Sequence, residues 1–167
     1  MRTLLLKLNE QHDRAFQLVS YAQSPFLLLV RLYWGWQLAQ SGWGKLHNLD
    51  KVAEFFTGLD LPLPAQMAVF IACVEFFGGI FFALGFFSRI TALVLTINLL
   101  MAYIIADREA FFSFFSDPDK FSAAAPYVFL FASLLVLIFG PGKFCVDALL
   151  RRFANIPRAA ERTPYAT

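Results

Sequence analysis

The fold is decided by residues 65–87, AQMAVFIACVEFFGGIFFALGFF, an apolar run with a single charged side chain, Glu75. A helix needs roughly 17–25 apolar residues to cross the hydrocarbon core of a bilayer. A backbone in lipid must satisfy its own hydrogen bonds, and an uninterrupted run of this length therefore predicts a helix. The stretch indicates a membrane span.

Three further apolar runs have comparable length. Residues 24–46 contain Arg31 and Lys45, whereas residues 90–106 and 123–140 contain no Asp, Glu, Lys or Arg. The chain is 59% hydrophobic and 16% charged, whereas a soluble domain is about 45–50% apolar and about 25% charged. We therefore expect an all-α fold, an integral membrane four-helix bundle that forms a single domain over residues 1–167.

Composition and motifs exclude several classes of function. A net charge of +2 does not supply the dense basic face that a nucleic-acid binder needs. Cys73 and Cys145 make neither a disulfide framework nor a zinc site, and no haem ligand pair, metal-binding spacing or dinucleotide fingerprint is visible. We expect no metal and no intrinsic cofactor, so any redox chemistry would use a borrowed or diffusible one.

The distribution of Lys and Arg predicts the orientation of the chain. The two terminal segments and the turn at Arg89 together carry nine Lys and Arg residues, and the opposite loops carry four. By the positive-inside rule, both termini lie in the cytoplasm. We expect a multi-pass protein of the cell inner (plasma) membrane.

The segments outside the spans are also patterned. Apolar residues recur at near-helical spacing in residues 4–19 and again in residues 146–153, which predicts amphipathic flanking helices that anchor to the membrane surface or, alternatively, dock a partner. The loop 47–64 contains Phe55 and Phe56, and the loop 107–122 contains Phe111, Phe112, Phe114 and Phe115. We expect these loops to lie flat as a partial lid, with simple interfacial anchoring as the alternative.

Ionisable residues inside a membrane span are costly, which makes Arg31 and Glu75 candidate functional residues. Helical spacing places Arg31, Gly35 and Lys45 on one face of the first span, and Glu75, Gly78 and Gly79 on one face of the second. Counting residues from the predicted boundaries at about 1.5 Å each puts Arg31 roughly 9 Å from the level of Glu75, and Lys45 roughly 15 Å from it.

These depths predict an ion pair between Arg31 and Glu75. The pair either fixes the register of the helices, or it forms a polar pocket in which it orients a polar head group or relays a proton. Two other span residues, Trp34 and Asn98, are candidate ligand contacts. Packing is the alternative for Trp34, and an interhelical hydrogen bond is the alternative for Asn98.

Three segments together resemble a known family. Arg31 and Gly35 with the run Ser41-Gly42-Trp43-Gly44-Lys45-Leu46 resemble the first-span motif of the DoxX family. Residues 75–79, EFFGG, and 85–89, GFFSR, are similar to its second-span motif. Residues 140–143, GPGK, with Asp147 are similar to its closing segment. The resemblance covers most of residues 25–150.

The resemblance implies a four-helix inner-membrane protein. The family takes its name from a subunit of a thiosulfate:quinone oxidoreductase, and other members are associated with membrane redox complexes. The resemblance therefore implies that this chain is a subunit of such a complex and not an independent enzyme. We expect the subunit to bind a quinone or a similar apolar ligand near the Arg31–Glu75 pair, and to work with a redox partner protein or as a homo-oligomer. The alternative is a non-catalytic scaffold that recruits a partner protein to the lipid bilayer.

Overall fold

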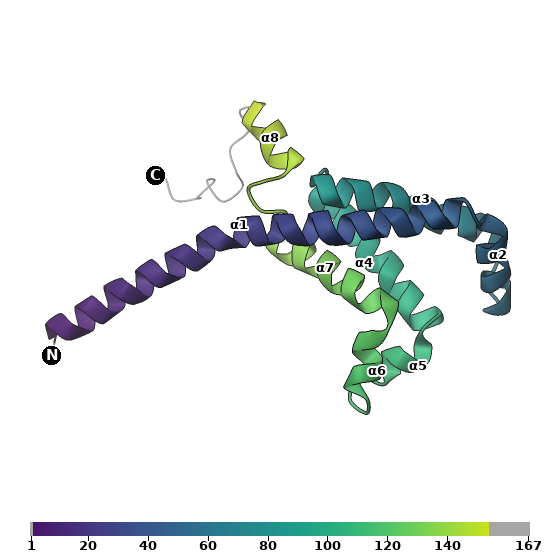
Figure 1. Cartoon of the computed structure of the whole chain (residues 1–167), viewed down its shortest axis with the longest axis horizontal. Coiled ribbons are helices and arrows are strands. Elements are labelled where there is room, and N and C mark those ends of the chain that lie inside the picture. The colour runs from purple at the N-terminus through teal and green to yellow at the C-terminus, as the bar shows by residue number, and fades with distance from the viewer. Residues whose placement is uncertain (1, 154–167) are drawn as a thin grey trace, which may run out of the picture.

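The computed structural model describes residues 2–153, and it describes side chains from residue 22 onward. This part of the chain is helical, without strands (Figure 1). Its elements are α1 (Arg2–Leu46), α2 (Leu49–Gly58), α3 (Pro64–Leu84), α4 (Ser88–Ile105), α5 (Arg108–Phe112), α6 (Pro118–Ala123), α7 (Ala125–Phe139) and α8 (Val146–Phe153).

The four longest helices make the predicted bundle. α1 packs along α3 and α4 packs along α7, while contacts between α3 and α4 and between α1 and α7 join the two pairs. α3 and α4 are long and apolar enough to cross a membrane, and α7 is a shorter apolar helix. The runs predicted at 24–46, 65–87, 90–106 and 123–140 all fall on these helices, which confirms the all-α four-helix fold.

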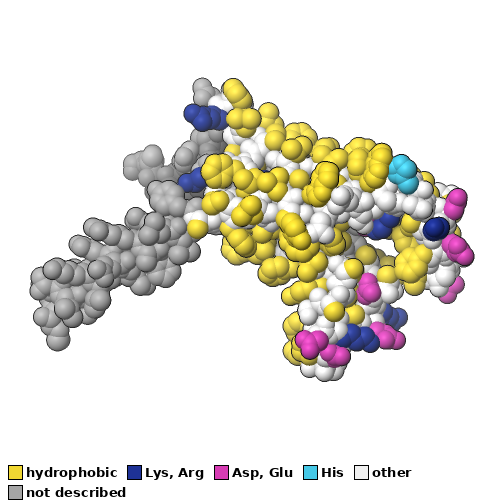
Figure 2. Space-filling view, viewed as in Figure 1, with side chains coloured by type: hydrophobic (Ala, Val, Ile, Leu, Met, Phe, Trp, Pro, Cys, Tyr) yellow, Lys and Arg dark blue, Asp and Glu magenta, His cyan; other side chains and the backbone are white. Residues whose placement is uncertain are grey.

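Apolar side chains fill the inside of this bundle and also cover its outside. The core is built from Leu38, Phe82, Leu95, Leu99 and Val136 with the small residues Ala92 and Ala132. Figure 2 shows that hydrophobic side chains also spread over the outer face of the bundle, while the acidic ones gather at the end that carries α2, α5 and α6. A large exposed apolar surface is typical of a protein that faces lipid.

The helix α1 is longer than the first predicted span, because it begins well before residue 24. A separate amphipathic helix was predicted at residues 4–19, but the backbone of α1 is helical without a break from Arg2 to Leu46 and contains Pro25. Proline removes one helical hydrogen bond and bends a helix without necessarily ending it, and α1 changes direction along its length (Figure 1). The side chains of residues 4–19, and so their predicted anchoring, lie outside the described side chains.

The second flanking helix is present as α8. Its charged residues include Arg151 and Arg152, and its apolar residues Leu149, Leu150 and Phe153 are exposed. Such an unburied apolar face on a short helix fits the predicted membrane anchor.

The opposite end of the bundle is more open. α4 and α7 diverge from α1 and α3 toward α5 and α6 (Figure 1). The predicted loop 47–64 contains α2, which packs on α3 and buries Phe56. The predicted loop 107–122 contains α5 and α6, and its Phe115 is exposed. The divergence and the packing of α2 create the space described below.

Candidate functional site

Glu75 is buried in the middle of α3, and its carboxylate has two partners on α1. Nζ of Lys45 lies 2.5 Å from Oε1 of Glu75. The hydroxyl of Ser41 donates to Oε2 at 3.1 Å. Each carboxylate oxygen therefore has one partner on α1, and both partners belong to the motif at residues 41–46.

The predicted ion pair between Arg31 and Glu75 is wrong. Arg31 is fully buried at the α8 end of the bundle, where its side chain donates to the carbonyl oxygens of Leu27 and Phe144. The helices are antiparallel, with Gly42 facing Glu75 and Arg31 facing Gly85. Ten residues of α3 separate these two levels, which corresponds to about 15 Å.

The direction of the side chains explains the correction. Side chains on a helix lean toward its N-terminus. Lys45 and Arg31 on α1 therefore both lean toward the α8 end, whereas Glu75 on the antiparallel α3 leans toward the α2 end. The side chains of Glu75 and Lys45 therefore point toward each other, whereas those of Glu75 and Arg31 point apart. Depths counted from the predicted span boundaries do not include this direction, and they favoured Arg31 instead of Lys45.

Glycines set the separation of α1 and α3. A Cβ atom added at Gly79 would lie 2.5 Å from the backbone nitrogen of Ala39, and one at Gly35 would lie 2.8 Å from the carbonyl oxygen of Gly79. A Cβ at Gly42 would overlap the backbone of Phe76. Close backbone approach of this kind is the usual role of small residues between membrane helices. Gly35 and Gly79 thus shape the helix pair that carries Lys45 and Glu75.

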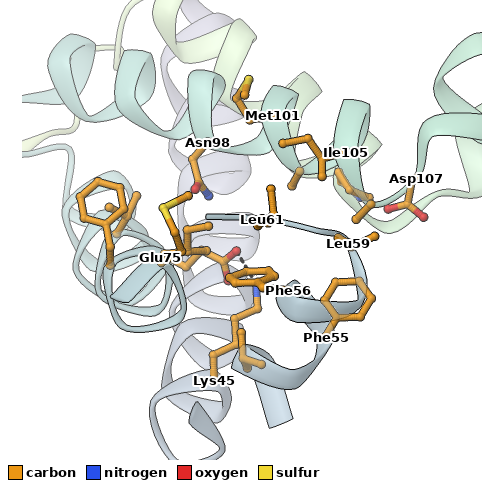
Figure 3. Close-up of a pocket in the computed structure, with 18 of the residues that line it drawn as sticks. Lys45, Phe55, Phe56, Leu59, Leu61, Glu75, Asn98, Met101, Ile105 and Asp107 are labelled. Atoms are coloured by element: carbon orange, nitrogen blue, oxygen red, sulfur yellow. Dashed lines mark hydrogen bonds and ion pairs between the residues drawn. The ribbon is translucent and has the colours of Figure 1, made fainter. Parts of the chain in front are cut away.

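A pocket of about 620 Å³ opens beside the Lys45–Glu75 pair, between α2, α3 and α4. We call it the apolar pocket. Its polar lining residues are Lys45, Lys51, Glu75, Asn98 and Asp107, and its apolar ones include Phe55, Phe56, Leu61, Phe70, Val94, Ile97 and Met101. Figure 3 shows Glu75 and Asn98 reaching into the same space from α3 and α4.

Asn98 has an unsatisfied donor in this pocket. Its amide nitrogen is buried and has no hydrogen-bond partner among the described residues. Leaving a buried donor unpaired costs about 1–3 kcal/mol. The alternative predicted for Asn98, an interhelical hydrogen bond, is not made by this nitrogen. A ligand with an acceptor atom in the pocket would satisfy it.

The pocket is open to the surface on the side where α3 and α4 meet. Phe70, Val94, Ile97 and Met101 line it and are also exposed on the outside of the bundle. Ligand sites of about 300–1,000 Å³ are typically apolar, with a few placed polar groups. This pocket therefore suits an amphiphile whose polar end meets Lys45, Glu75 and Asn98 and whose apolar part leaves between α3 and α4.

The remaining candidate residues do not line the pocket. Trp34 packs at the bundle core with its ring edge-on to Phe129, and the packing alternative describes it. Gly78 faces Leu95 of α4, whose side chain a Cβ would meet at 2.8 Å. Of the predicted site residues, only Lys45, Glu75 and Asn98 line the apolar pocket, while Gly35 and Gly79 meet where α1 and α3 cross.

Arg31 instead holds the α8 end together. Its guanidinium lies against Gly85, where α3 ends with a φ of 69°, and an added Cβ there would overlap Nη1 of Arg31. Glycine is required by both the backbone angle and the space. Nearby, Asp147 accepts from the backbone nitrogens of Phe87 and Ser88 at 2.8 Å and so caps α4. Arg31, Gly85 and Asp147 thus fix the loop after α7 against the turn between α3 and α4.

Sequence reasoning missed Ser41, Phe55, Phe56 and Leu61 as pocket or pair residues. Ser41 and Lys45 are four residues apart on one helix face, which was a signal for a shared partner. The phenylalanines and Leu61 had no such signal, because their place depends on how α2 packs against α3.

No group of three His, Cys, Asp or Glu side chains that could hold a metal ion occurs in the described part of the chain. The model of the DoxX family matches residues 26–108, which run from α1 into α5 and include Lys45, Glu75 and Asn98. The chain belongs to the DoxX family. No curated protein and no solved structure matches it.

As a DoxX protein, the chain is an all-helical integral membrane protein that contacts the lipid bilayer. The match includes both predicted span motifs, at residues 31–46 and 75–89. It ends before the segment 140–147, so the likeness of that segment to the family's closing motif stays a prediction.

Proposed function

We propose that the apolar pocket binds the head group of a quinone or a similar apolar carrier, and that the protein acts as a subunit of a membrane redox complex. The observation that carries the proposal is the unpaired amide nitrogen of Asn98 in an apolar pocket beside the Lys45–Glu75 pair. A quinone offers carbonyl oxygens, which accept hydrogen bonds from amide and ammonium groups. Its apolar tail fits the exposed opening between α3 and α4.

The residues present suit such a head group. Asn98 and Lys45 supply donors, and the Glu75 carboxylate supplies an acceptor for the hydroxyl of a reduced head group. A quinone supplies two-electron redox chemistry when it is bound. The chain's own residues would bind and orient the ring and hold a proton acceptor beside it at Glu75.

We also propose a four-span topology in the cell inner (plasma) membrane, with both termini and the α8 end on the cytoplasmic side. The support is the charge pattern of the described residues: Arg89, Lys143, Arg151 and Arg152 lie at the α8 end, while the acidic side chains gather around α2, α5 and α6 (Figure 2). Labelling of Cys145 with an impermeant maleimide tests it. We expect labelling in inverted vesicles and none in intact cells; the reverse pattern would contradict the orientation.

The functional proposal is tested by purifying the full chain in mild detergent and extracting what travels with it. Mass spectrometry and the ultraviolet quinone–quinol difference spectrum identify the extract, and co-purifying proteins report a redox partner. We expect a stoichiometric quinone that is lost in Glu75→Gln. The matched control is Glu109→Gln, which removes the exposed pair of Glu109 with Lys120 at 2.9 Å. Bulk phospholipid alone, in wild type and variants alike, would favour the scaffold function.

A further inference from the structure

A second pocket, of about 770 Å³, opens at the α8 end of the bundle. Its charged lining residues are Arg89 at the start of α4, Lys143 in the loop after α7, Arg151 in α8, and one acid, Asp147. We call it the basic pocket. It shares no lining residue with the apolar pocket.

Among the described residues that line the basic pocket, the one acid is already engaged. Asp147 accepts from the backbone nitrogen of Phe87 with one carboxylate oxygen, and from the backbone nitrogen and hydroxyl of Ser88 with the other, at 2.6–2.8 Å. The negative charge of Asp147 lies at the N-terminus of α4, where negative charge is stabilising. The described lining thus presents three cations on three different segments, with a single carboxylate among them that is already hydrogen-bonded.

The rim of the basic pocket is apolar. Ile90, Phe139 and Leu150 line it and are exposed by 63%, 58% and 49%. Leu149 and Phe153 continue the exposed apolar surface along α8. A free phosphate ion would use only the cations, whereas a phospholipid would use the cations for its head group and the rim for its acyl chains.

We propose that the basic pocket binds the phosphate head group of an anionic phospholipid from the leaflet at the α8 end. Arg89 and Arg151 hold the head group from two sides, and the acyl chains run over Ile90 and Phe139. Basic pockets between membrane helices suit such head groups, and each Lys or Arg near the surface adds roughly five-fold in affinity. The bound lipid bridges α4 and α8 and so fixes the short α8 against the bundle.

The test is native mass spectrometry of the full-length protein in detergent, titrated with phosphatidylglycerol or phosphatidylcholine of the same chains. We expect phosphatidylglycerol to bind at least ten-fold more tightly. The variant Arg89→Gln with Arg151→Gln should weaken it by about 25-fold. The control, Arg108→Gln with Lys120→Gln, removes the same charge at the opposite end and should stay within two-fold. Both arginines are exposed, which favours a folded variant.

Three results would overturn the proposal. Equal binding of the two lipids would show that the pocket does not recognise the anionic head group. An equal loss in the control variant would show that only net charge matters. Displacement of the lipid by millimolar inorganic phosphate would assign the site to a soluble anion instead. A single Arg151→Gln variant, with an expected loss of about five-fold, checks the result should the double variant fold poorly.

Discussion

The ion pair between Lys45 and Glu75 joins a side chain that is 33% exposed to one that is 4% exposed. The side chain of Lys45 is partly exposed, so its ammonium can reach water, while the carboxylate of Glu75 lies between helices. The two partners are therefore not equivalent. Removing the cation leaves a buried negative charge, whereas neutralising the acid leaves a cation that can turn toward solvent.

This asymmetry predicts unequal losses of stability. We expect Lys45→Met to lower the free energy of unfolding by about 2 kcal/mol or more, because a buried charge loses its partner. Glu75→Gln should cost about 1 kcal/mol, since an amide still accepts a hydrogen bond from Ser41. Thermal unfolding of the purified variants in one detergent measures both. Lys120→Met, in the exposed pair with Glu109, is the control and should leave the free energy of unfolding almost unchanged, because water screens that pair. Equal losses for the three variants would contradict the assignment.

Neighbouring glycines in α1 should respond in opposite ways to alanine. Gly42→Ala places a methyl group on the backbone of Phe76 and should destabilise the protein by about 3 kcal/mol or prevent its folding, because the backbone cannot give way. Gly44 has nothing within 4 Å of an added Cβ. Gly44→Ala should therefore be neutral or stabilising by up to about 1 kcal/mol through helix propensity. Thermal unfolding distinguishes them, and similar melting temperatures would contradict the close contact of α1 and α3.

Substitution of Arg31 should loosen the α8 end of the bundle without changing ligand affinity. Arg31→Met removes the donor to the carbonyl of Phe144, so we expect hydrogen exchange in residues 140–146 to rise at least ten-fold. Quinone affinity should stay within two-fold, because Arg31 does not line the apolar pocket. Hydrogen exchange measured by mass spectrometry tests the first expectation, and a quinone-binding titration tests the second. A folded variant that no longer binds ligand would place Arg31 in the site.

Asp147 should stabilise the N-terminus of α4 as a capping residue that comes from a distant part of the sequence. Asp147→Ala removes three hydrogen bonds from the start of α4, and we expect a loss of about 1–2 kcal/mol. Asp147→Asn keeps an acceptor but loses the charge at the helix N-terminus, so it should cost about half as much. Thermal unfolding ranks the stabilities of wild type and the two variants. An alanine variant as stable as wild type would rule out the cap.

The helices could be predicted from the sequence because they depend on local composition. Residues 65–87 and 90–106 have the length and apolarity of spans, and α3 and α4 lie on them. The start of α1 could not be predicted, because whether Pro25 ends or bends a helix depends on what packs around it.

The site was only half predictable for a related reason. The sequence selected Glu75 as a buried acid and placed Lys45 on the right face of its helix. It did not identify the partner, since that choice depends on the offset between two antiparallel helices and on the opposite lean of their side chains. The apolar pocket depends on tertiary packing of α2, which no spacing in residues 47–64 encodes.

The measurement that tests the central claim most directly is equilibrium binding of a short-chain quinone to the purified protein. We expect one saturable site per chain, and an affinity about ten-fold weaker in Asn98→Leu, because one hydrogen bond to the head group is lost. Thr96→Val is the control: its hydroxyl is also buried without a partner among the described residues, but Thr96 does not line the pocket. Unchanged affinity in Asn98→Leu, or no saturable binding in wild type, would contradict the account.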